Sequence, residues 1–190
     1  MSDWQTLHDE AVSQLSRAGK ETAVAFSAIT AERLMRLDPQ RLPFTRGLRP
    51  LLDLVWRAAA GDASAFKPIA VALGEFYISE YWHNDGQDGP NDADDDPAAA
   101  TLYAAMCYMH SPTFAANVAT RAIDAADNWV QLAADDDDYA DSDPAMLAEA
   151  QQQLATLAAL APLAPQLKQA RRLPVPERER LLAQLKALVD

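Results

Sequence analysis

Residues 3–37 read DWQTLHDEAVSQLSRAGKETAVAFSAITAERLMRL, and the spacing of their apolar side chains decides the fold class. In the first half of this stretch, apolar residues return every three or four positions, which places them on one face of an α-helix. That face consists of Trp4, Leu7, Ala11, Leu15 and Ala18. The second half, from about Lys20 to Leu37, has the same spacing and is stopped by Pro39. The stretch therefore predicts two consecutive helices that each bury one face.

Helical spacing continues over nearly the whole chain, and no segment of the sequence alternates as a strand would. Pro68 falls in the first turns of one expected helix and predicts a kink or a late start there. Ser111-Pro112 predicts a turn that folds the next helix back on the preceding one, whereas Pro162 and Pro165 are expected to interrupt the pattern. The expected helices cover about 48–60, 63–83, 98–110, 113–132, 143–160, 166–172 and 176–189. These observations predict one all-α domain, residues 1–190, built as a bundle of about seven to nine helices.

Composition excludes several other classes of protein. Of the 190 residues, 49% are hydrophobic and about a fifth are alanine, the best helix former, so the chain is not disordered as a whole. A charged fraction of 23% and a mean hydropathy of -0.20 exclude an integral membrane protein. Cys107 is the only cysteine, and the first residues lack the basic start and apolar core of a signal peptide. We therefore expect a soluble, cytoplasmic protein of bacterial type without membrane contact.

Charge is distributed unevenly along the chain. The formal net charge of -12 argues against a nucleic-acid ligand, because phosphates would be repelled over most of the surface. Residues 75–149 contain 17 acidic side chains and one base, Arg121, whereas the C-terminal helical segment, about 166–190, is rich in Lys and Arg. Two acidic loops are expected, at about 84–96 and 135–143. They are either solvated loops that touch nothing or a negative surface that attracts a basic partner.

We expect the acidic loops to form the contact surface for such a partner. Tyr81 and Trp82 directly precede the first loop and are expected to act as apolar anchors beside a charged rim. The other aromatic side chains, Trp129 among them, fall on helical segments and are expected to fill the core. The predicted acidic contact residues are Asp85, Asp88, Asp92, Asp94, Asp95, Asp96, Asp135, Asp136, Asp137 and Asp138.

Two Glu/Cys-x-x-His steps support an alternative function. Glu80 and His83 are one helical turn apart, and Cys107 and His110 repeat this spacing. If their two helices faced each other, these four side chains would form a zinc-ligand set in a metal-binding bundle or metal-dependent enzyme. In the competing interpretation the histidines meet solvent near helix ends, and Cys107 is a small apolar side chain. Its apolar neighbours are expected to raise the pKa of Cys107, which disfavours a nucleophile, and we predict neither a cofactor nor catalysis.

Four runs of sequence carry a family resemblance: AFSA at 25–28, AERL at 31–34, LRPLLDLVW at 48–56 and NVATRAIDAAD at 117–127. Across these runs the chain resembles a group of all-helical bacterial proteins that includes uncharacterised proteins and the immunity proteins of polymorphic toxin systems. The resemblance implies a protein that binds and neutralises a cognate toxin, and it carries over no catalytic residue.

Taken together, these features predict a non-catalytic, acidic binding protein whose partner is a basic protein. Its most specific form is an immunity protein that neutralises a cognate toxin. A helical scaffold protein whose acidic residues bind nothing is a further alternative, and a homo-oligomer is left open.

Overall fold

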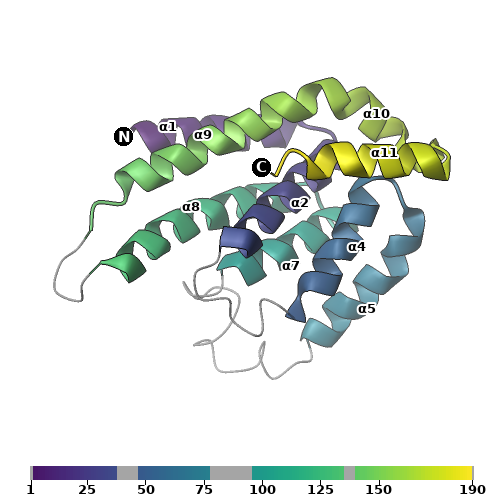
Figure 1. Cartoon of the computed structure of the whole chain (residues 1–190), viewed down its shortest axis with the longest axis horizontal. Coiled ribbons are helices and arrows are strands. Elements are labelled where there is room, and N and C mark those ends of the chain that lie inside the picture. The colour runs from purple at the N-terminus through teal and green to yellow at the C-terminus, as the bar shows by residue number, and fades with distance from the viewer. Residues whose placement is uncertain (1, 38–46, 78–95, 135–139, 190) are drawn as a thin grey trace.

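The structure is a computed structural model that describes residues 2–37, 47–77, 96–134 and 140–189. Throughout these ranges every regular element is helical (Figure 1), and the predicted all-α bundle of seven to nine helices is confirmed. Short 3-10 turns cover Ala63–Ala65, Ala161–Leu163 and Ala170–Arg172. The α-helices are α1 (Asp3–Arg17), α2 (Lys20–Leu37), α4 (Arg49–Ala59), α5 (Phe66–Tyr77), α7 (Asp96–Met109), α8 (Phe114–Ala133), α9 (Asp143–Leu160), α10 (Ala164–Gln169) and α11 (Val175–Lys186).

Helices α2 and α7 pack against each other at the centre of the bundle. Every residue of α2 from Ala23 to Leu34 is buried, and α7 is buried from Asp96 to Tyr108 apart from Tyr103. Many of these buried positions are alanine, whose small side chain lets neighbouring helices approach closely. The other long helices surround this pair: α8 returns along α7, α1 lies along α9, and α4 packs against α2 (Figure 1).

Two prolines act at helix ends as the sequence predicts. After α4, Asp62 accepts a hydrogen bond from the backbone N–H of Ser64 at 3.0 Å and caps a 3-10 turn. Helix α5 begins only at Phe66, so Pro68 lies in its first turn, and the expected late start is confirmed. Pro112 lies in the turn between α7 and α8, which pack side by side as the expected hairpin.

The C-terminal prolines interrupt the α-helical pattern as expected, because α9 ends at Leu160 and the 3-10 turn Ala161–Leu163 separates it from α10. Each occupies one of the first two positions of a new helical segment, where a backbone N–H has no intrahelical acceptor and its absence costs little. The chain passes from α9 through a 3-10 turn into α10, and helical geometry continues to Arg172. Helix α11 then packs on α2 and α4 and buries Leu181 and Leu185.

Some sequence predictions lie outside the described residues. They concern Pro39 as the residue that stops the second helix, the end of the helix expected to reach residue 83, the first acidic loop up to residue 95, and residues 135–139 of the second. Among the helices that are described, none combines the length and the apolar character needed to cross a bilayer.

Candidate functional site

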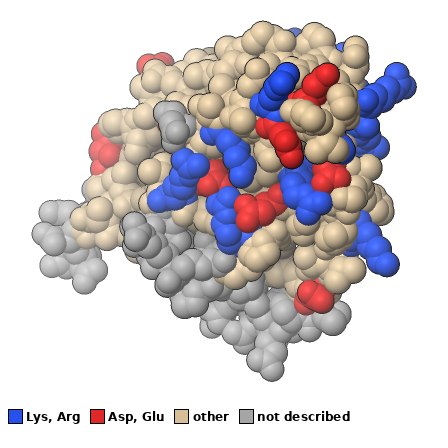
Figure 2. Space-filling model, turned by 45° about the vertical axis from the view of Figure 1, so that its right-hand side comes forward, with Lys and Arg blue, Asp and Glu red and all other residues tan. Residues whose placement is uncertain are grey.

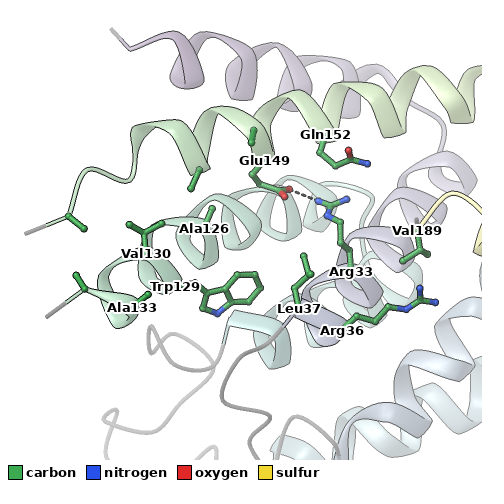
Figure 3. A pocket seen from close by; sticks show the side chains of 14 residues that line it. Arg33, Arg36, Leu37, Ala126, Trp129, Val130, Ala133, Glu149, Gln152 and Val189 are labelled. Carbon is green, nitrogen blue, oxygen red and sulfur yellow. Dashed lines mark hydrogen bonds and ion pairs between the residues drawn. The ribbon is translucent and has the colours of Figure 1, made fainter.

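Helices α2, α8 and α9 line an open cavity of about 960 Å³, with Val189 at one side (Figure 3). Leu37 at the end of α2 and Trp129 on α8 provide its larger apolar surfaces. The hollow forms because much of the remaining wall is alanine, which fills little of the space between helices. These small wall residues are Ala126, Ala133, Ala134, Ala140, Ala145 and Ala148.

An ion pair between Arg33 and Glu149 lies at one end of this cavity. Figure 3 shows Arg33 extending from α2 toward α9, where its Nη2 donates to Oε1 of Glu149. The two side chains are only 10% and 12% exposed. Burial raises the pKa of Glu149, and the positive charge of Arg33 opposes that shift. Nη1 of Arg33 is also buried but has no hydrogen-bond partner among the residues that the structure describes.

Gln153 fixes the position of Glu149 by connecting it to two further helices. Its Nε2 donates to the backbone carbonyl of Ala119 at 2.8 Å and to Oε1 of Glu149 at 3.3 Å. Its Oε1 lies 3.1 Å from Nδ1 of His8 on α1. Because Gln153 is fully buried, these bonds hold the polar end of the cavity in one geometry.

A second buried carboxylate, Glu32, joins α2 to α4 beside the cavity. Glu32 accepts hydrogen bonds from Nε of Arg36 at 3.0 Å, Nη1 of Arg49 at 2.8 Å and Nε1 of Trp56 at 3.0 Å. Burial alone would raise the pKa of Glu32, but these bonds outweigh it and lower the pKa to about 2. Arg36 lines the cavity as well, so the Glu32 cluster also positions one of the cavity's cations.

Asp96 is the one predicted contact residue that falls within the described ranges, and its side chain is fully buried. Its Oδ2 accepts from Nδ2 of Asn128 at 2.8 Å, and its Oδ1 lies 3.3 Å from Nη1 of Arg121. Burial raises the pKa of Asp96 to about 6, although Asn128 and Arg121 oppose the shift. In the folded chain Asp96 therefore joins α7 to α8 and does not present its carboxylate to a partner.

The remaining predicted contact residues and two of the candidate metal ligands lie outside the described residues. Their predicted roles as contact residues or metal ligands therefore stay predictions from the sequence. They are Tyr81, Trp82, Asp85, Asp88, Asp92, Asp94, Asp95, Asp135, Asp136, Asp137, Asp138, Glu80 and His83.

The other two candidate metal ligands lie near the end of α7 in different surroundings. Cys107 is fully buried, its Sγ is 3.9 Å from the carbonyl of Pro112, and burial raises the pKa of its thiol to about 11. His110 is exposed and its ring centroid lies 6.5 Å from that of Phe114. Within the described ranges no three His, Cys, Asp or Glu side chains gather as metal ligands would.

Sequence reasoning missed the cavity residues. Trp129 is expected in the core, but it is only partly buried and forms a cavity wall. Arg33 and Glu149 are 116 positions apart in sequence, so no local spacing connects them. One signal was present: residues 22–31 of α2 contain no charged side chain on any face, and charges such as Glu32 and Arg33 that directly follow such a stretch require buried partners.

Comparison with protein-family models, with curated proteins and with solved structures finds no match for this chain. The resemblance to toxin-immunity proteins therefore stays a prediction from the quoted sequence runs.

Proposed function

We propose that this chain is a non-catalytic helical binding protein that recognises a basic protein, most specifically as an immunity protein that neutralises a cognate toxin. The observation that carries the proposal is the segregation of charge. Segments 78–95 and 135–139 together contain ten acidic residues and no Lys or Arg, against a net charge of -12 for the whole chain. Such a concentration of negative charge steers a basic protein toward one region of the surface.

The two acid-rich segments are attached to neighbouring parts of the bundle. Segment 78–95 leads into Asp96, which begins α7 and is hydrogen-bonded to Asn128 of α8. Helix α8 ends at Ala133, two residues before segment 135–139 begins. Their attachment to paired helices supports a single acidic region as the contact surface.

The C-terminal helices carry the opposite charge. Figure 2 turns the right-hand side of the molecule forward and shows Lys and Arg side chains spread over it, with Asp and Glu between some of them. Several cations of the C-terminal helical segment form no ion pair with any described residue; they are Lys168, Arg171, Arg172, Arg180 and Lys186. A basic partner is repelled from this side, so the charge pattern favours one orientation of approach.

Co-expression with the products of adjacent open reading frames tests the proposal. We expect one basic product to inhibit growth alone, to be tolerated when this chain is present, and to co-purify with it at low ionic strength. Neutralising Asp135, Asp136, Asp137 and Asp138 to Asn should weaken the complex by about tenfold or more, and added salt should weaken the wild-type complex similarly.

The matched control removes the same charge elsewhere. Asp9, Glu10, Glu177 and Glu179 are exposed residues of α1 and α11, and their amide variants should leave the affinity within about twofold, because screening limits their reach. If both variants lost affinity for the partner equally, the effect would come from net charge and not from the acid-rich segment 135–139. Absence of any interacting product, or a complex indifferent to salt, would contradict the proposal.

A further inference from the structure

The cavity between α2, α8 and α9 has the properties of a small-molecule site. Its volume of about 960 Å³ lies within the range of ligand pockets, roughly 300–1,000 Å³. Its walls are mostly apolar, and its polar groups gather where Arg33, Glu149 and Gln152 meet (Figure 3). Apolar walls with a few convergent polar groups are the usual composition of a site that binds and orients a ligand.

The hydrogen bonds of Arg33 indicate what kind of group a ligand would bring to this cavity. Nη2 is committed to Glu149, whereas Nη1 has no acceptor among the described residues, although the side chain is nine-tenths buried. A buried N–H without an acceptor costs about 1–3 kcal/mol, so an acceptor brought by a ligand would remove a penalty that the free protein bears. Because Arg33 lines the cavity, a ligand bound there lies next to its guanidinium.

The hydrogen-bonding groups of the described lining residues favour an anionic acceptor over a cation. Among the residues that the structure describes, the lining contains two arginines, Arg33 and Arg36, and one acid, Glu149; Arg36 is itself paired with Glu32 at 3.0 Å. Glu149 is already paired with Arg33 and hydrogen-bonded by Gln153. A ligand amine would meet no unengaged acid among these residues, whereas a carboxylate can accept from Nη1 of Arg33, a guanidinium donor without a partner among the described residues.

We propose that this cavity binds a small molecule with an apolar body and a single carboxylate. The carboxylate accepts hydrogen bonds from Arg33, and the body lies against Trp129, Leu37 and the alanine walls. This ligand site is additional to the proposed protein-binding function, and it does not require a protein partner.

Two matched series of probes test this site by calorimetry on the full chain. One has an indole body (indole-3-propionate, its amide and tryptamine), and the other has an octyl body (octanoate, octanamide and octylamine). In at least one series we expect saturable binding of the acid below about 1 mM, and about tenfold weaker binding of the amide and the amine.

Two variants assign the binding to this cavity. Arg33→Gln should abolish the preference for the acid over the amide, and circular dichroism will show whether that variant folds. Ala126→Leu fills the cavity while leaving the Arg33–Glu149 pair intact, and it should weaken all three probes of the series that binds. As a control, Arg172→Gln removes an exposed cation outside the cavity and should leave binding unchanged.

Three results would overturn the proposal: neither acid binds, the amine binds as tightly as the acid, or binding of the acid survives Ala126→Leu. None of these results bears on the protein partner, because every measurement uses this chain alone. Conversely, failure to find a basic partner leaves the carboxylate proposal intact.

Discussion

Glu32 and Asp96 are both buried carboxylates, yet their surroundings move their pKa values in opposite directions. Glu32 is surrounded by three donors from Arg36, Arg49 and Trp56, which together outweigh the cost of burial. Asp96 is fully buried and has two donors among the described residues, and these do not outweigh the cost of burial. Each residue therefore makes the stability of the protein depend on pH, with opposite sign.

Replacing Glu32 by Gln should destabilise the protein by about 3 kcal/mol at neutral pH, because two arginines lose their buried counter-charge. The pKa of Glu32 is about 2 in the folded state, below its ordinary 4.5. Its contribution to the free energy of unfolding is therefore present above pH 4.5 and is lost as the pH falls through 2. Urea unfolding across this range should show the acid-side loss in the wild type and not in the variant. Asp53→Asn is the control, since its half-exposed pair with Arg49 should matter by less than about 1 kcal/mol.

Replacing Asp96 by Asn should have the reverse pH signature. The folded-state pKa of about 6 lies above the ordinary 3.8. The contribution of Asp96 to the free energy of unfolding is therefore fully present below pH 3.8 and is lost as the pH rises through 6. From about pH 4 to 7, the wild type should lose on the order of 2 kcal/mol relative to D96N in unfolding experiments. Asp9→Asn, at an exposed position of α1, should run parallel to the wild type. If the stability of D96N depended on pH in the same way as that of the wild type, the conclusion that burial raises the pKa of Asp96 would be contradicted.

At the scale of elements, Gly61 sets the contact between the end of α4 and the C-terminal helices. Its φ of 87° lies in the left-handed region, which glycine adopts without strain. A Cβ placed there would lie 2.3 Å from the backbone carbon of Ala170, which follows α10. The carbonyl of Gly61 also accepts from Nη1 of Arg178 on α11 at 3.5 Å. The glycine therefore permits a backbone-to-backbone approach that a side chain would block.

Gly61→Ala should destabilise the protein by roughly 2–4 kcal/mol, because it combines an unfavourable φ with a backbone clash. Gly74→Ala is a matched control within helix α5, where no described residue lies within 4 Å of the added Cβ. That replacement should stabilise by about 0.5–1 kcal/mol. Thermal unfolding measures the stability of both variants. Because both changes are Gly→Ala, an opposite sign of their effects shows that the backbone geometry at Gly61, and not the type of substitution, causes the loss.

The helices themselves were predictable from sequence because each has a local signature. Apolar spacing located α1, α2 and α8 to within about two residues. The start of α10 was expected at about residue 166 and lies at Ala164, because a proline at the start of a new helical segment and one that ends a helix look alike until the segment boundaries are known. The cavity was not predictable, since it depends on the relative placement of three helices and on alanines whose neighbours are distant in sequence.

At the scale of the whole molecule, α2 and α7 couple the other helices into one cooperative unit. Ala28→Leu inserts three carbon atoms into a fully buried position of α2 and should lower the unfolding midpoint by overpacking, at a cost of about 1–3 kcal/mol. The far-UV and near-UV circular dichroism transitions should still coincide. Ala183→Leu, at an exposed position of α11, should shift stability by less than about 0.5 kcal/mol. Separate transitions in the wild type would contradict the central role of this helix pair.

The position of Trp129 provides a natural optical reporter. The indole N–H groups of Trp4 and Trp56 are fixed by hydrogen bonds to Asp143 and Glu32, both at 3.0 Å, so their emission should stay constant when the cavity fills. The ring of Trp129 faces the cavity, and displacement of water from that wall should shift its emission to shorter wavelength. With non-fluorescent octanoate as titrant, the blue shift should vanish in Trp129→Phe, which lets occupancy be followed without any label.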